Sequence, residues 1–344
     1  MNKLFLLAVV WAFAFGCAHA AAARPDWISG KDSQKYPSNR FLVGMGQSEE
    51  LSKAQDRARA EIAKFFSVKV EQEVSSVQKT SDSDGPKGKS WLSSTSVNET
   101  MKTTVAGTLQ GVEIKETWQD PVLKNYYVLA VLPRAPVESR LTEEVMDLDS
   151  KIKSALAKSD GAADKILKIK WMVRAYDLYQ QRRLVNNQLS VVSLDGEGIK
   201  PSPEIAGVND KLTDLLGKIV VSVDIKGDLS GPISEAIISS LTNGHISVNP
   251  GDGNSDILIT GKTEIKPSDE NSSIGFVFAK GRAFISIINR ADGKTFGSVE
   301  HEDREGAKDM QGAKASVISQ LKDEIINDFN EKFRSALSLG DGLR

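Results

Sequence analysis

Apolar and polar positions alternate in patterns that change along the chain, and the first patterns predict a strand followed by a helix. Residues 41–43 form a short apolar run that ends at a predicted turn, Gly44-Met45-Gly46. Beyond it, apolar side chains recur at helical spacing with charges between them, which predicts an amphipathic helix from Ser48 to about Ser67 or beyond. The apolar positions of this helix are Leu51, Ala54, Ala58, Ile62 and Phe65.

The next segment predicts a loop and a β-hairpin that complete a first domain over residues 25–136. Residues 80–95 are polar, rich in Gly and Ser and without a period, so they are interpreted as a mobile loop. Alternation over residues 109–118 and a β-branched and aromatic run over 126–132 predict two strands joined by a short loop. One strand, a helix and a hairpin make an α+β domain.

The middle of the chain, residues 137–190, predicts two helices. Apolar side chains recur at spacings of three and four over residues 138–158, and a second helical pattern runs from about 162 to 189 after an Asp-Gly break. Two amphipathic helices joined by a short turn are expected to pack as an antiparallel αα-hairpin. Residues 191–216 are interpreted as a linker, because the stretch 195–207 is rich in Gly and Pro and has no period.

The last segment, residues 217–340, predicts a second α/β domain in the order β-α-β-β-β-β-α. The expected strands are 219–225, 246–248, 256–265 and 276–288, with a hairpin turn at 289–293 before the fifth strand. The expected helices are 232–241 and 307–339. The chain is therefore expected to be α+β, with two small α/β domains separated by the helical hairpin, each domain a sheet with helices mainly on one face.

The N-terminus has the pattern of an export signal. Residues 4–15 are an apolar run with a basic residue before it and small residues after it. The run is too short to span a bilayer core of roughly 30 Å, so residues 1–20 are interpreted as a cleaved signal. Two cleavage positions stay open. One lies before Cys17, in a lipobox-like sequence that would make Cys17 a lipidated first residue, and the other follows Ala20 at an Ala-x-Ala site.

Composition narrows the classes of function that the folded domains can have. The chain has 44 Lys and Arg against 46 Asp and Glu, for a net charge of −2, so no nucleic acid is expected as a partner. Cys17 is the single cysteine of the sequence. A disulfide framework, a cysteine-ligated metal site and thiol chemistry are therefore not expected in the folded domains.

Four short patterns could carry chemistry, and each is interpreted as structure or chance. Gly44-Met45-Gly46 lacks the third glycine of a dinucleotide fingerprint. Residues 251–256 resemble the opening of a calcium loop but lack its sixth-position Gly and twelfth-position Glu. The run Glu300-His301-Glu302-Asp303 does not complete His-Glu-x-x-His, and the Ser-x-x-Lys that begins at Ser150 has no partner motifs. No catalytic residue, cofactor or metal site is assigned, and the protein is expected not to be an enzyme.

Trp91 is a different kind of candidate, because it is an aromatic side chain within the polar stretch 80–95. It is interpreted either as a lone surface aromatic or as an anchor that contacts a partner or a membrane surface.

Several residues together resemble the LPP-twenty lipoprotein family over about residues 25–142. They are Pro25-Asp26-Trp27, Tyr36-Pro37, the run from Phe41 to Gly46, Ala54, Ala58, Ala60, Gly111-Val112, Trp118 and Tyr126-Tyr127-Val128-Leu129-Ala130. The resemblance implies an exported, often outer-membrane-anchored protein of Gram-negative bacteria, related to the amino-terminal domain of flagellar assembly protein T. The family has no catalytic residues to carry over. The lipobox departs from the usual pattern, because Ala14 stands where Leu is usual and Phe15 is bulky.

The sequence therefore predicts a non-enzymatic, exported cell-envelope protein. It is expected at the periplasmic face of the outer membrane, held by a lipid on Cys17 if that residue is acylated, or in the soluble periplasm. Its expected partners are other cell-envelope proteins, which it would bind as a structural or assembly adaptor, for example for the outer membrane or the flagellum. The alternative left open is a periplasmic regulator or ligand-binding module of the cell-wall machinery.

Overall fold

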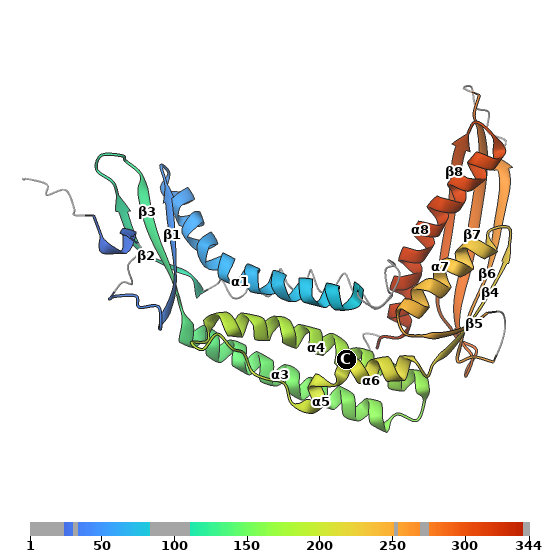
Figure 1. Cartoon of the computed structure of the whole chain (residues 1–344), viewed down its shortest axis with the longest axis horizontal. Coiled ribbons are helices and arrows are strands. Elements are labelled where there is room, and N and C mark those ends of the chain that lie inside the picture. Colours follow the sequence, from blue (N-terminus) through green and yellow to red (C-terminus); the bar gives the residue numbers. More distant parts are fainter. Residues whose placement is uncertain (1–23, 30–33, 83–110, 251–253, 269–274, 340–344) are drawn as a thin grey trace, which may run out of the picture. The chain divides into compact units, whose positions relative to one another are not determined.

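The structure is a computed structural model, and it describes residues 24–29, 34–82, 111–250, 254–268 and 275–339. These residues form a mixed α+β structure with a three-stranded and a five-stranded sheet (Figure 1), which confirms the expected class. By their internal contacts they divide into two compact units. The first unit combines the residues up to Ile62 with Val112–Leu132, and the second combines those from Ala63 with the chain from Pro133 onward.

The first unit is a three-stranded sheet in the order β1-β3-β2. Its elements are the short 3-10 helix η1 (Asp26–Ser29), β1 (Phe41–Ser48), the beginning of helix α1 (Leu51–Asp82), β2 (Glu113–Gln119) and β3 (Tyr126–Pro133). Strand β3 is central and almost fully buried. On one face, Leu129 and Val131 pack with Tyr36, and Trp27 lies against them. The segment that precedes β1 therefore covers part of this face of the sheet.

Three expectations for the first unit differ from the structure. The strand expected at residues 41–43 continues to Ser48, so Gly44-Met45-Gly46 lies inside a strand and not in a turn. Helix α1 continues to Asp82, so the first residues of the expected loop 80–95 are helical, and the rest of that loop lies outside the described residues. Strand β2 begins at Glu113, so Gly111 and Val112 precede it, and residues 109–110 of the expected strand lie outside the described residues.

The second unit contains a pair of long antiparallel helices, α3 (Arg134–Gly161) and α4 (Lys165–Val192). The guanidinium of Arg134, at the start of α3, donates to the carbonyl oxygens of Val191 and Val192 at the end of α4, at 2.9 and 3.0 Å. At the other end of the pair, the Ser159 hydroxyl donates to the Lys168 carbonyl at 2.9 Å. The helices thus pair with opposite directions, as the short turn between two amphipathic helices predicts.

The segment 191–216, expected as a linker, is partly helical. It contains α5 (Pro203–Ala206) and α6 (Val208–Leu216). In α6, Val208, Leu212 and Leu216 repeat at a spacing of four and are buried. Prolines and glycines mark where these helices start and stop, because Pro is favoured in a first helical turn and Gly at a helix end. Residues 203–216 are therefore largely helical, although the sequence predicted no helix here.

The rest of the second unit is a five-stranded sheet with two helices on one face (Figure 1). The elements in chain order are β4 (Val220–Gly227), α7 (Ser230–Asn243), β5 (Ser247–Pro250), β6 (Ile257–Ser268), β7 (Val277–Asn289), β8 (Thr295–Ala307) and α8 (Met310–Ala336). The sheet order is β5-β4-β6-β7-β8, with β4 parallel to β5 and β6, and with antiparallel pairs β6–β7 and β7–β8. The predicted order of elements is confirmed.

The core of this sheet lies between its inner face and helix α8. Along β7, Ala279, Ala283, Ile285 and Ile287 are buried while their neighbours in the chain are more exposed, so one face points to the helices. Helix α8 contributes a continuous buried stripe, which consists of Val317, Leu321, Ile325, Phe329 and Phe333. A spacing of three and four residues keeps such side chains on one side of a helix.

Within the described ranges, no helix is both long enough and apolar enough to cross a membrane.

Candidate functional site

Two residues that the sequence singles out, Cys17 and Trp91, lie outside the described residues. The same holds for residues 251–253 of the calcium-like stretch. Cys17 and Trp91 therefore remain predictions.

The glycines of β1 allow helix α1 to approach the sheet closely. A methyl group on Gly46 would run into the carbonyl oxygen of Ala54, and one on Gly44 would run into that of Ala58. Ala54 and Ala58 are themselves fully buried. The Gly-x-Gly pattern ahead of an Ala-rich helix thus makes room for packing between a strand and a helix.

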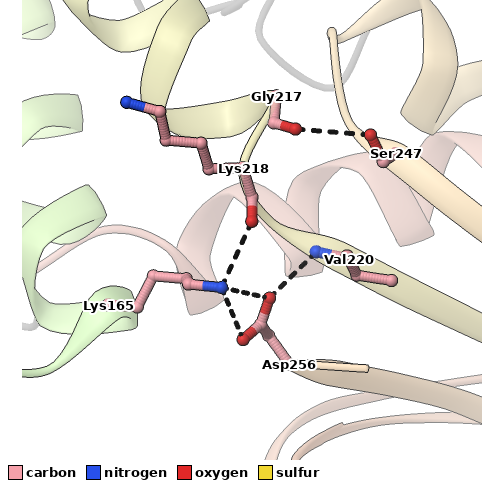
Figure 2. Close-up of polar contacts among 6 residues, drawn as sticks. All are labelled: Lys165, Gly217, Lys218, Val220, Ser247 and Asp256. Atoms are coloured by element: carbon pink, nitrogen blue, oxygen red, sulfur yellow. Dashed lines mark hydrogen bonds and ion pairs between the residues drawn. The ribbon is translucent and has the colours of Figure 1, made fainter. Parts of the chain in front are cut away.

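Asp256 and Lys165 form a polar cluster that ties the start of α4 to the sheet (Figure 2). The Lys165 ammonium lies 2.9 Å from each carboxylate oxygen of Asp256 and donates to the carbonyl oxygen of Lys218 at 3.2 Å. One Asp256 oxygen also accepts from the Val220 N–H at 2.9 Å. The carboxylate that the sequence placed in a calcium-like loop is therefore engaged in structural contacts.

The run from Glu300 to Asp303 is divided between the two faces of the sheet, because side chains alternate along a strand. His301 faces α8, where its Nε2 lies 2.9 Å from Asp328 and its Nδ1 lies 3.4 Å from Glu324. Glu300 and Glu302 instead pair with Arg282 and Lys280 of β7. Across the described ranges, no group of three or more His, Cys, Asp or Glu side chains could hold a metal ion.

Two mostly buried ion pairs in the helices were not predicted. Arg182 of α4 is 1% exposed; it pairs with Asp149 of α3 and donates to the Ile199 carbonyl at 3.1 Å. Arg334 of α8 pairs with Asp177 of α4. Burial raises the pKa of the Asp177 carboxyl, and the nearby Arg334 charge partly opposes this rise. The sequence held an indication of the buried position of Arg182, because this arginine lies at the helical spacing of the apolar, buried residues of α4.

The tip of the β2–β3 hairpin is the most exposed apolar feature of the first unit. Val122 is 82% exposed and Leu123 is 64% exposed. One Asp120 carboxylate oxygen accepts from the N–H groups of Val122 and Leu123 at 2.8 and 2.9 Å, which fixes the turn. The sequence predicts a turn here but does not show that its apolar side chains stay uncovered. The hairpin tip, residues 120–124, is the candidate contact site of this unit.

Comparison with known proteins agrees with the resemblance carried by the first domain. Residues 25–133 match the family described as LPP20 lipoprotein. This range begins just before η1 and ends with β3, so it contains all three strands of the first unit and the whole of α1. The predicted likeness to this lipoprotein family is thereby confirmed for that part of the chain. No curated protein matches the chain at a significant level.

Among solved structures, the secreted protein HP1454 from Helicobacter pylori is similar over most of the chain. It is 13% identical, with a TM-score of 0.39, and the match covers 86% of this chain and 98% of that one. Lipoprotein GNA1162 from Neisseria meningitidis is 11% identical with a TM-score of 0.25, and the match covers 33% of this chain and 99% of that one. A minor lipoprotein from Acinetobacter baumannii is 12% identical with a TM-score of 0.23, covering 34% and 89%.

Proposed function

We propose that the protein is an exported, lipid-anchored protein of the cell envelope that binds other envelope proteins and catalyses no reaction. The observation that carries the proposal is the match of residues 25–133 to a lipoprotein family, which begins a few residues after Cys17. Acylation of Cys17 would hold the first unit close to a membrane. Its role there is that of a structural or assembly adaptor for the outer membrane or the flagellum.

The chemistry of the described side chains supports a binding role and not a catalytic one. Two of the polar groups that the sequence singles out are paired within the fold: Asp256 with Lys165, and His301 with Asp328 and Glu324. A catalytic site would also need a nucleophile within reach of the same base, whereas in the described part of the chain the partners of His301 are these two carboxylates. These pairings stabilise the fold, which is what an adaptor needs from its polar residues.

The alternative, a periplasmic ligand-binding module of the cell-wall machinery, has weaker support. A hollow in the second unit is lined by Ser268, Lys280, Glu302, Asp303 and Arg304. Lys280 pairs with Glu302 at 2.7 Å, and Arg304 donates to the Ser268 hydroxyl at 3.1 Å. Ligand sites are mostly apolar concavities with a few convergent polar groups, whereas all five side chains that line this hollow are polar or charged.

The lipid anchor is tested by Cys17→Ser. We expect the wild-type protein to stay in the membrane fraction after a high-salt wash, because several acyl chains add about 0.8 kcal/mol of membrane affinity for each buried CH₂. We expect the variant to leave that fraction, and mass spectrometry of the wild type to find an acylated Cys17 as the first residue. Unchanged fractionation together with an unmodified chain that starts at Ala21 would show that the protein has no such anchor.

The adaptor role is tested by affinity capture of the tagged wild type from solubilised envelopes. The tagged Cys17→Ser variant is the matched control, since it shares every folded surface but lacks the anchor. We expect the wild type to enrich defined envelope proteins relative to this control. An adaptor role is excluded if crosslinking before solubilisation captures no protein reproducibly.

A further inference from the structure

The β2–β3 hairpin presents an apolar tip on a rigid support. The ladder between β2 and β3 ends with the pair Gln119 and Tyr126, and the tip, residues 120–124, follows directly. Lys124 has a left-handed backbone (φ 61°), and its N–H donates to the Asp120 carbonyl at 2.9 Å. The Gln119 side chain donates to the Lys124 carbonyl at 3.0 Å. Val122 and Leu123 are therefore held outward by a closed network of hydrogen bonds.

Aromatic side chains flank the tip on both strands, in a pattern suited to an interface between lipid and water. Trp118 and Tyr127 are cross-strand partners with ring centroids 5.5 Å apart, and Tyr126 occupies the last rung before the tip. All three are partly exposed. Trp and Tyr concentrate where a protein passes from the apolar to the headgroup layer, because their rings are apolar at one end and polar at the other.

The charges around the tip fit phosphate headgroups. Lys124 supplies a cation within the tip itself, and the charge of Arg24 acts on the Asp120 carboxyl. The pKa of the Asp120 carboxyl is lowered by the N–H groups of Leu123 and Val122 and, to a smaller degree, by the Arg24 guanidinium. Asp120 therefore uses its charge within the turn, while Arg24 and Lys124 offer positive charge to anionic lipids.

The position of Arg24 also links the tip to the proposed anchor. Cys17 precedes Arg24 by seven residues (24 − 17), and an extended chain spans at most about 3.5 Å per residue. An acylated Cys17 would therefore keep Arg24, and with it this side of the first unit, within about 25 Å of the bilayer. A tether of this length greatly raises the local concentration of lipid at a weak apolar contact.

We propose that the hairpin tip, residues 120–124, inserts Val122 and Leu123 into the headgroup region of a lipid bilayer, as a second membrane contact beside the N-terminal anchor. This inference rests on the proposed function, because two exposed apolar side chains alone bind membranes weakly. Together, the tether and the tip fix the orientation of the first unit at the membrane. A protein partner for the same tip is the competing outcome of the test.

The test replaces the lipid by an artificial tether, so its result does not depend on acylation of Cys17. The chain from Ala21, which contains no cysteine, receives an N-terminal hexahistidine sequence and is bound to vesicles of phosphatidylglycerol and phosphatidylethanolamine with nickel-chelating lipid. An environment-sensitive fluorophore is attached through Leu123→Cys. The matched control is Leu194→Cys in the second unit, where the native residue is 69% exposed. We expect the emission at position 123 to rise and shift to the blue on vesicles, and that at position 194 to stay unchanged.

A second measurement removes the apolar side chains of the tip. Without the hexahistidine sequence, the variant Val122→Ser/Leu123→Ser should bind the same vesicles about tenfold more weakly than the wild type, because each buried methylene group adds affinity. The control Leu194→Ser should bind as the wild type does. Equal binding of all three proteins, or emission at position 123 that stays as in water on tethered vesicles, would overturn the proposal. If Cys17 proved not to be acylated, the proposed function would be contradicted, but the outcomes of these two experiments would not change.

Discussion

At the scale of single residues, the packing of the first unit depends on two glycines, because their lack of a side chain lets the helix approach the strand. Gly44 and Gly46 lie on the face of β1 that meets α1, and the helix presents Ala54 and Ala58 there. Backbone atoms of α1 leave no room for a methyl group at either glycine. A larger residue at either position must therefore shift the backbone, because a carbonyl oxygen of a helix cannot rotate away as a side chain can.

The first prediction tests this close packing with Gly46→Ala. The added methyl group must displace the backbone at Ala54, and overpacking of this kind costs about 1–3 kcal/mol of unfolding free energy. We expect the upper part of that range, measured by calorimetry. The matched control is Gly161→Ala, where nothing lies within 4 Å of the new Cβ and where Ala is the better helix former. A Gly46→Ala protein as stable as the control would contradict the packing argument.

The second prediction concerns Asp177, whose pKa is raised by burial from its ordinary value of 3.8. At pH values between 3.8 and the raised pKa of the folded state, the folded state binds more protons than the unfolded state. The contribution of Asp177 to the free energy of unfolding therefore falls as pH rises through this range. We expect the unfolding free energy of the wild type minus that of Asp177→Asn to be greatest below pH 3.8 and to decrease up to the raised pKa. Urea denaturation at a series of pH values measures it. A difference that increases with pH would mean that Arg334 outweighs burial.

At the scale of elements, the sequence predicts best what is long and periodic. Helices α3, α4 and α8 each carry an apolar stripe over several turns, so their existence and approximate extent followed from spacing alone. Helix α6 was missed because it has only nine residues beside a stretch rich in Gly and Pro. Strand β1 was predicted too short because glycines were interpreted as a turn, whereas packing against α1 is what requires them.

The candidate sites were less predictable than the fold, because they join residues that are distant in the sequence. Lys165 and Asp256 are 91 positions apart, and no local pattern indicates that they meet. The exposure of Val122 and Leu123 is likewise a property of the folded unit. A turn sequence predicts where the chain reverses but not what covers it.

The third prediction tests the contact between α4 and the sheet that Figure 2 shows. A double-mutant cycle with Lys165→Met and Asp256→Asn removes the ion pair, and Asn keeps an oxygen for the Val220 N–H. The Lys165 side chain is 48% exposed and that of Asp256 is 26% exposed, so we expect a coupling of only about 0.5–1 kcal/mol. Lys218→Ala is the control, because this residue contributes its carbonyl oxygen and should change stability by less than about 0.5 kcal/mol. Additive single variants would show that the pair contributes nothing.

At the scale of the whole molecule, the described residues divide into two units with separate apolar cores. The first core contains Tyr36, Leu129 and Val131, and the second contains the buried stripe of α8, in which Phe329 and Phe333 stack with centroids 5.5 Å apart. The proposed functions use this division. The match to the lipoprotein family covers the first unit from Pro25 onward and, in addition, the rest of α1, and the hairpin tip belongs to the first unit.

The last prediction is that the two units unfold in two transitions, since units with their own cores unfold as separate cooperative units. Gly46→Ala should lower the transition of the first unit and leave the other in place. Phe329→Ala should do the reverse, because removing a fully buried Phe side chain costs about 3–5 kcal/mol, which lowers a midpoint by roughly 10 °C in a unit of this size. Scanning calorimetry of the chain from Ala21 measures both midpoints. If each variant shifted one common transition, the chain would unfold as a single cooperative body.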